Sequence, residues 1–328
     1  MACTGGPLRD WNAASGIDGL TQSHSIEAAY AACRAIAKRE AKNFYYSFVA
    51  LPASKRDAMC AIYAFMRHAD DISDDESKDH ATRRDELTRW TAAWRDGTDM
   101  ADPVFIAVRD TQQRFNIPDE LLEQLIDGTA MDLQPEAANR RGLDGLDTFA
   151  TFSDLYRYCY YVASVVGLVC IRIFGYSHPS AEKLAEETGV AFQLTNILRD
   201  VREDADRRRV YIPSDDLKGS GTNAAELAHV KTASELTEPQ RLALAGVARR
   251  ARAYYQSADR LLPLIAADSR PALRVLVKIY SQLLSKIEAR RFDVFTARVQ
   301  VPTWQKLLIL SGGMMRMLTL RLWGGRPR

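Results

Sequence analysis

The chain lacks the patterns that mark disulfide-stabilised, zinc-binding and secreted proteins. Its five cysteines are scattered and odd in number, and no two form a Cys-x-x-Cys pair, which argues against a disulfide framework or a zinc site. The five histidines show no metal-ligand spacing. No uninterrupted apolar run reaches the length that a transmembrane helix requires, and the N-terminus lacks the basic start and apolar run of a signal peptide. We therefore expect a cytoplasmic protein with reduced thiols.

Strand signals are also scarce, since alternating segments joined by Asn-Gly or Asp-Gly turns are nearly absent. Helical periodicity dominates instead, and prolines fall near the ends of the periodic runs, where helices tolerate them. The sequence therefore predicts an all-α fold. The runs predicted as helices are 26–46, 55–72, 81–94, 103–115, 119–133, 153–174, 181–203, 238–261 and 271–292.

No charge-neutral linker divides the 328 residues, and a net charge of +2 gives no general attraction to nucleic acid. We expect a single helical bundle around a central cavity, formed by residues 25–300. Residues 1–24 are expected to form a mobile N-terminal tail, and the polar segment 214–236 a loop or mobile flap. The basic, amphipathic tail 301–328 is expected either to pack on the core or to rest on the anionic inner face of a membrane.

The first informative motif is a pair of aspartates at the end of an apolar helical run. Asp70 and Asp74 are four residues apart and so lie on one helix face, where like charges repel. A lone acidic stretch is usually a solvated helix end, but the apolar residues 61–66 favour the floor of a cavity. Tyr63 and Arg67 precede the acids on the same helix, and the guanidinium is placed to restrain the carboxylates or to bind a phosphate.

A second acidic motif follows more than a hundred residues later and is more specific. The amides and carboxylates that succeed one another at helical spacing are Gln193, Asn196, Asp200 and Asp204. Such oxygens are the ligands that Mg²⁺ prefers, and Mg²⁺ commonly combines a few carboxylates with substrate phosphates and waters. A network of salt bridges on the helix surface, for instance of Arg199 with Glu203, is the alternative. Two acidic motifs facing each other across a cavity would bind hard cations and, through them, an oligophosphate.

Other segments fit the same chemistry. A basic cluster at 206–213 lies beside the second acidic motif, and aromatic runs at 42–48 and 158–161 offer ring faces, although each run alone is more often ordinary core. A prenyl diphosphate ionises when metal ions and basic side chains neutralise its leaving group. The allylic cation then needs a dry pocket with aromatic and aliphatic walls.

Together these segments resemble the squalene/phytoene synthase family, over about Ile26 to Val299. The resemblance rests on residues 43–46 with Leu51-Pro52, and on 63–74, 158–163, 193–204 and 209–213. It implies an isoprenoid-synthase fold for the catalytic domain. It also implies head-to-head condensation of two prenyl diphosphates through a cyclopropylcarbinyl diphosphate.

The resemblance assigns roles to individual positions. Tyr158 matches a catalytic tyrosine near the reacting carbons. The ligands implied for Mg²⁺, or for Mn²⁺ in its place, are Asp70, Asp74, Asn196, Asp200 and Asp204. The four aspartates among them are also implied to be catalytic. The substrate-binding positions implied are Asn43, Tyr63, Arg67, Gln193, Asn196, Arg199, Arg209, Tyr280 and Arg298.

Substrate length and the fate of the intermediate stay open. Segments 162–167 and 287–295 look more like bacterial hopanoid-pathway enzymes that join two farnesyl diphosphates into presqualene diphosphate or squalene. Geranylgeranyl diphosphate, giving phytoene, is the alternative. NADPH use is open because the chain has no Gly-rich dinucleotide fingerprint, and reduction in this family requires none. Ser164 and Arg208 stand where many members have glycine and a small residue.

A different class of function is a non-catalytic, membrane-associated assembly factor of the same fold. Such factors have lost their acids. Because this chain keeps both acidic motifs, the enzyme is the favoured interpretation.

Overall fold

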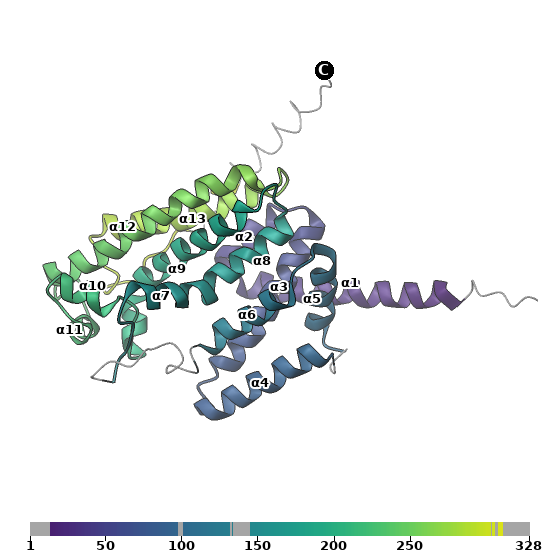
Figure 1. Ribbon diagram of the computed structural model, residues 1–328, viewed down its shortest axis with the longest axis horizontal. Helices are drawn as coiled ribbons and strands as arrows, with labels where there is room; N and C mark the ends of the chain where they lie inside the picture. Colours follow the sequence, from purple (N-terminus) through teal and green to yellow (C-terminus); the bar gives the residue numbers. More distant parts are fainter. Residues whose placement is uncertain are drawn as a thin grey trace, which may run out of the picture.

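The computed structural model describes residues 14–97, 101–131, 133, 145–302, 304–305 and 308–310, with the side chains of 14–24, 42–44 and 46 left out of the description. Helices make up nearly all of its regular structure (Figure 1). In chain order the elements are α1 (Ala14–Glu40), α2 (Lys42–Val49), α3 (Ala53–Ser73), α4 (His80–Asp96), α5 (Pro103–Phe115), α6 (Asp119–Ala130), β1 (Asp147–Thr148), α7 (Phe152–Cys159), the π-helix η1 (Tyr160–Ser164), α8 (Val165–Phe174), α9 (Ser180–Asp206), β2 (Arg209–Val210), α10 (Ser214–Gly219), α11 (Ala224–His229), α12 (Glu238–Leu261), the 3₁₀ turn η2 (Leu262–Leu264) and α13 (Arg270–Ala289).

Side-chain caps determine where several of these helices begin and end. Asp79 accepts a hydrogen bond of 2.7 Å from the amide of Thr82 at the start of α4, and Asp102 accepts one of 2.7 Å from Val104 at the start of α5. Each such cap stabilises a helix by about 1 kcal/mol. Helix α5 ends at Asn116 in the left-handed conformation, with φ of 49°, a usual way to stop a helix. The local sequence therefore sets these boundaries.

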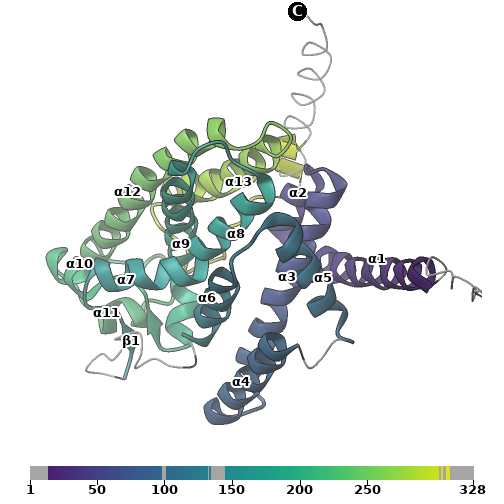
Figure 2. The ribbon, with the colours of Figure 1, turned by 45° about the vertical axis from the view of Figure 1, so that its right-hand side comes forward.

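The helices bury two apolar cores that meet along α13. The first core is built mainly from α1, α3, α4, α5, α6 and α8, and the second from α7, α9, α12, α13 and the segment that follows α13. In α13, Ala272 and Leu273 belong to the first core, whereas Val275 to Ile287 face the second. Figures 1 and 2 show α12 and α13 alongside α9, with α3 and α5 on the other side of the bundle. The two cores place α3 and α9 on opposite sides of the molecule's centre.

The π-helix η1 lies where these two groups of helices meet. A Cβ added to Gly128 of α6 would lie 2.6 Å from the carbonyl oxygen of Tyr161, and one added to Gly189 of α9 would lie 2.6 Å from Cα of Ser164. Only glycine permits such close backbone approach. Both α6 and α9 therefore pack directly on the backbone of η1. Single π turns inside α-helices are frequent at functional sites.

The all-α prediction is confirmed, but several boundaries differ from the expectation. The described residues include one strand pair, a two-residue parallel pairing of β1 with β2. Run 26–46 divides into α1 and α2, and segment 214–236 contains α10 and α11, so it is not a loop throughout. Helix α1 begins at Ala14, inside the expected tail, and its first half extends away from the bundle (Figures 1 and 2). Residues 1–13 and 311–328 of the two expected tails lie outside the described residues.

One run among the described residues, Phe152–Phe174, is long and apolar enough to cross a membrane by length and composition alone. It comprises α7, η1 and α8, and 44% of its most apolar window is buried inside the protein. A helix of a buried core passes the same test, so the run carries no conclusion about a membrane.

Candidate active site

The first acidic motif closes helix α3. Asp70 lies in its last turn and Asp74 caps it, with the amide of Asp74 donating to the carbonyl of Asp70 at 2.8 Å. Burial, and next the charge of Asp74, raise the pKa of the Asp70 carboxyl to about 6. Thr129 of α6 donates to Asp70 Oδ1 at 3.3 Å, but among the described residues Asp70 forms no ion pair. The negative end of the helix dipole adds to this unfavourable charge.

Arg67 lies one turn before Asp70 but pairs with its neighbour Asp71. Its Nε is buried and has no hydrogen-bond partner within the described part of the chain. An unused donor of this kind is costly unless something binds it. Tyr63, a further turn back, packs edge-on against Phe48 at 6.4 Å between ring centroids, and burial raises the pKa of its phenol.

The second acidic motif lies in the last four turns of α9. Asn196 donates from Nδ2 to Gln193 Oε1 at 3.3 Å, while its Oδ1 is buried and accepts no hydrogen bond from any described residue. Asp200 is held by two arginines. Arg199 donates from Nε and Nη2 at 2.7 and 2.5 Å, and Arg298 donates from Nη2 at 2.9 Å. The suggested pairing of Arg199 with Glu203 is therefore not the one observed.

Two aromatic pairs lie in the second core, which α9 helps to form. Tyr280 of α13 is 3% exposed and stacks on Phe192 of α9 at 4.6 Å. Burial raises the pKa of its phenol, against the opposing charge of Arg199. Tyr158 of α7 stacks on Tyr211 at 5.1 Å, and its hydroxyl donates to the Tyr211 hydroxyl at 3.3 Å. Tyr211 was not singled out as a site residue, although it lies in the 209–213 segment that carried the resemblance.

The structure brings together some of the predicted residues. On α9, Asn196 is hydrogen-bonded to Gln193, and one turn later Asp200 binds both Arg199 and Arg298. Tyr63, Arg67, Asp70 and Asp74 follow one another along α3. Helix α8 packs on both α3 and α9, with η1 also against α9. The two acidic motifs thus belong to two helices that are joined by the segment containing Tyr158.

The remaining predicted residues lie at the edges of this arrangement. Asp204 is in the last turn of α9, and Arg209 begins β2. The side chain of Asn43, in α2, lies outside the described residues. Arg208, between α9 and β2, has φ of 61°, and its Nε donates to the carbonyl of Gly145 at 3.1 Å.

Comparison with known proteins decides the family. The squalene/phytoene synthase family model matches residues 24–305. The chain belongs to the squalene/phytoene synthase family. Phytoene synthase of Arthrospira platensis is 32% identical over 302 residues, covering 88% of this chain and 93% of that protein. Phytoene synthase of Mycobacterium tuberculosis is 32% identical, covering 90% and 93%.

Solved structures of the squalene/phytoene synthase family share the fold. A dehydrosqualene synthase crystallised with a ligand superposes with a TM-score of 0.77 at 27% identity, covering 91% of this chain and 99% of that one. The squalene synthase HpnC of Alicyclobacillus acidocaldarius superposes with a TM-score of 0.71 at 25% identity, covering 82% and 96%. The protein is therefore a prenyltransferase with the all-α isoprenoid-synthase fold.

Members of the squalene/phytoene synthase family bind diphosphate through divalent metal ions. Within the described residues, no three His, Cys, Asp or Glu side chains come close enough together to hold a metal ion alone. The donor set still fits such an ion. The buried Oδ1 of Asn196 has no hydrogen-bond partner among the described residues, and burial together with the charge of Asp74 raises the pKa of Asp70. Oxygen donors that lack a partner or a compensating charge suit Mg²⁺, which would take its other ligands from phosphate and water.

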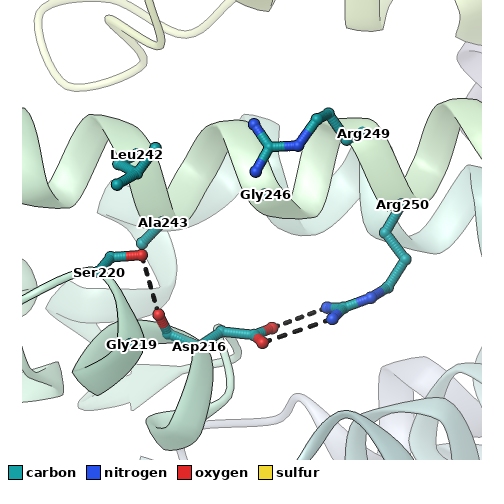
Figure 3. Close-up of a pocket in the computed structure, with 8 residues that line it drawn as sticks. All are labelled: Asp216, Gly219, Ser220, Leu242, Ala243, Gly246, Arg249 and Arg250. Atoms are coloured by element: carbon teal, nitrogen blue, oxygen red, sulfur yellow. Dashed lines mark hydrogen bonds and ion pairs between the residues drawn. The ribbon is translucent and has the colours of Figure 1, made fainter.

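A surface cleft of about 580 Å³ lies elsewhere, between α10 and α12 (Figure 3). Arg250 closes one end by pairing with Asp216 at 2.7 Å while its guanidinium lies 4.0 Å from the Phe152 ring centroid. Arg249 extends over Gly246 into the cleft (Figure 3). None of the residues predicted for catalysis lines this cleft, so we do not assign it to the prenyltransferase site.

Proposed function

We propose that this prenyltransferase joins two farnesyl diphosphates head to head, with presqualene diphosphate as the first product. Loss of diphosphate from one substrate leaves an allylic cation at its C1. The C2–C3 double bond of the second substrate attacks this carbon, and loss of a proton closes the cyclopropane while the second diphosphate is retained. The residues that we assign to ionisation are those of the two acidic motifs.

One observation supports this proposal: the two acidic motifs present an unused donor and an unused acceptor on different helices. Arg67 Nε on α3 lacks an acceptor, and Asn196 Oδ1 on α9 lacks a donor, in the part of the chain that the structure describes. A neutral ligand would not satisfy both the cationic donor and the electron-rich acceptor as well as an anion accompanied by a metal ion. A diphosphate with bound cations meets both demands.

The chain's residues have distinct roles in the proposed reaction. Asp70, Asp74, Asn196, Asp200 and Asp204 would hold Mg²⁺, which neutralises the charge that develops on the leaving diphosphate. Arg67 donates to phosphate oxygens from its unused Nε. Tyr158 and Tyr211 present stacked rings, whose faces stabilise a nearby carbocation.

Structural likeness supports farnesyl diphosphate, because the dehydrosqualene and squalene synthases that superpose on this chain carry product names of the thirty-carbon class. The curated relatives at 32% identity are phytoene synthases, so geranylgeranyl diphosphate is the second candidate. Retention of both acidic motifs speaks against a non-catalytic assembly factor. NADPH use and a membrane contact of the C-terminal tail stay predictions.

Product analysis tests the proposal. The purified protein is incubated with farnesyl or geranylgeranyl diphosphate and Mg²⁺, with and without NADPH, and the extracts are analysed by mass spectrometry. We expect Mg²⁺-dependent diphosphate release and a thirty-carbon product from farnesyl diphosphate. The Asp70→Ala and Asp200→Ala variants should fold and lose this activity. Full activity in both variants would refute the assigned mechanism. A forty-carbon product alone would show that the substrate is geranylgeranyl diphosphate and not farnesyl diphosphate.

A further inference from the structure

The segment that follows α13 is held firmly against α9. We call residues 290–301 the strap. It begins with two consecutive residues in the left-handed region, Arg291 at φ 51° and Phe292 at φ 63°, which is uncommon for residues other than glycine. The turn leads the chain back onto the second core, where Phe295 is fully buried. Arg202 of α9 donates to the carbonyl of Phe295. The strap is therefore anchored by packing and by a charged hydrogen bond.

This anchoring places Arg298 on the second acidic motif. Its guanidinium donates to Asp200 Oδ1 at 2.9 Å and lies 3.3 Å from Glu203. Arg199 occupies the same Oδ1 and also Oδ2. Both carboxylate oxygens of Asp200, which is 17% exposed, are thus engaged by arginine donors. Asp70 in the first motif forms no ion pair with any described residue.

The two acidic motifs therefore differ in their readiness for a metal ion. A cation approaching Asp200 meets two guanidinium groups already in contact with the carboxylate, and these repel it. Displacing them with a metal ion alone would remove the acceptor of Arg199 and would leave Arg298 only its contact with Glu203. An incoming diphosphate removes this obstacle, because its oxygens accept the forked guanidinium donors at least as well as a carboxylate does.

We propose that Arg298, carried by the strap, keeps Asp200 closed to metal ions until diphosphate arrives and then exchanges the carboxylate for the phosphate oxygens. This inference rests on the proposed function and adds an order of binding to it. Arg298 is 45% exposed, so the exchange takes a side-chain movement, while Phe295 and Arg202 hold the strap in place. Metal ions and diphosphate then bind the second motif cooperatively, and by linkage each raises the other's affinity equally.

Metal binding without turnover tests the inference. Mn²⁺ serves as the probe, and its binding to the full chain is measured by calorimetry and electron paramagnetic resonance, with and without inorganic diphosphate. The test variant is Arg298→Gln. The matched control is Arg290→Gln, which removes the same charge from an exposed strap residue that forms no ion pair with the described residues.

Without diphosphate, we expect Arg298→Gln to bind Mn²⁺ about tenfold more tightly than wild type, since one opposing cation is gone. Arg290→Gln should change this affinity by less than about twofold. In wild type, inorganic diphosphate should increase the affinity for Mn²⁺. In Arg298→Gln, the same addition of diphosphate should increase the Mn²⁺ affinity much less.

Unchanged or weaker Mn²⁺ binding by Arg298→Gln overturns the inference, as does an equal gain in both variants. If Arg298→Gln does not fold, Arg298→Lys replaces it. It keeps the charge but loses the fork, so a smaller gain of about two- to threefold is expected, and no gain overturns the inference. A wild-type protein that binds no Mn²⁺ with diphosphate contradicts the proposed function itself, which separates the two failures.

Discussion

Replacing Asp70 with asparagine should stabilise the metal-free protein while abolishing its activity. The pKa of Asp70 is raised from 3.8 to about 6 by burial and by Asp74, so the folded state holds a proton that the unfolded state has released. Stability therefore falls as pH rises from 3.8 to 6, and the full cost is present above pH 6. Two pKa units correspond to about 3 kcal/mol as an upper limit. Asparagine keeps the shape and carries no such cost.

Urea unfolding at two pH values measures this effect. At pH 8 without metal, Asp70→Asn should raise the free energy of unfolding by about 1–3 kcal/mol, whereas at pH 4.5 the gain should shrink to about a third, because most of the difference in ionisation lies above that pH. Asp85→Asn, an exposed change of the same chemistry on α4, is the control and should be neutral at both pH values. Added Mn²⁺ with diphosphate should stabilise wild type more than Asp70→Asn. A variant no more stable than wild type at pH 8, or equally stabilised at both pH values, refutes the electrostatic reasoning.

Two further predictions concern packing and substrate binding. Gly189→Ala should lower the free energy of unfolding by at least about 2 kcal/mol, because the new Cβ would lie 2.6 Å from Cα of Ser164. Gly219→Ala is the control and should be nearly neutral, because its Cβ would meet nothing within 4 Å. Thermal unfolding compares the two variants, and equal melting temperatures would show that α9 moves away from η1 at little cost. Arg67→Gln should raise KM for the prenyl diphosphate about tenfold or more, because a charged hydrogen bond is lost. Its effect on the melting temperature should be smaller, because the side chain is 40% exposed. An unchanged KM in steady-state assays would show that Arg67 does not bind the diphosphate.

Helix existence was predictable where local chemistry is strong. The bounds of α5 and α12 agree with the sequence pattern to the residue, because each begins with a side-chain cap and a proline in its first turn. Helices α10 and α11 were not predicted, since six residues are too few for a periodic signal. The π turn was also missed, because an apolar run looks the same whether or not one residue is inserted.

The composition of the candidate site was more accessible to the sequence than its contacts. The α3 and α9 residues could be grouped by helical spacing alone. The partner of Arg199 could not, because Asp200 and Glu203 are both within its reach and packing decides between them. The contact of Arg298 with Asp200 joins residues 98 apart in sequence. It depends on the left-handed turn at Arg291 and Phe292, which no local sequence pattern predicts.

The π-helix η1 allows one continuous apolar segment to serve two cores. Before it, Leu155 and Tyr158 face the second core, and after it Val165 and Val169 face the first. A π turn contains one residue more than the α-helical turn it replaces, and each residue turns an α-helix by about 100°. Deleting a single residue from 160–164 would therefore rotate all of α8 relative to α7, turning Val165 and Val169 away from their partners while leaving the composition of the helix almost unchanged. The length of this segment, counted to the residue, is thus as much a condition of the fold as its hydrophobicity.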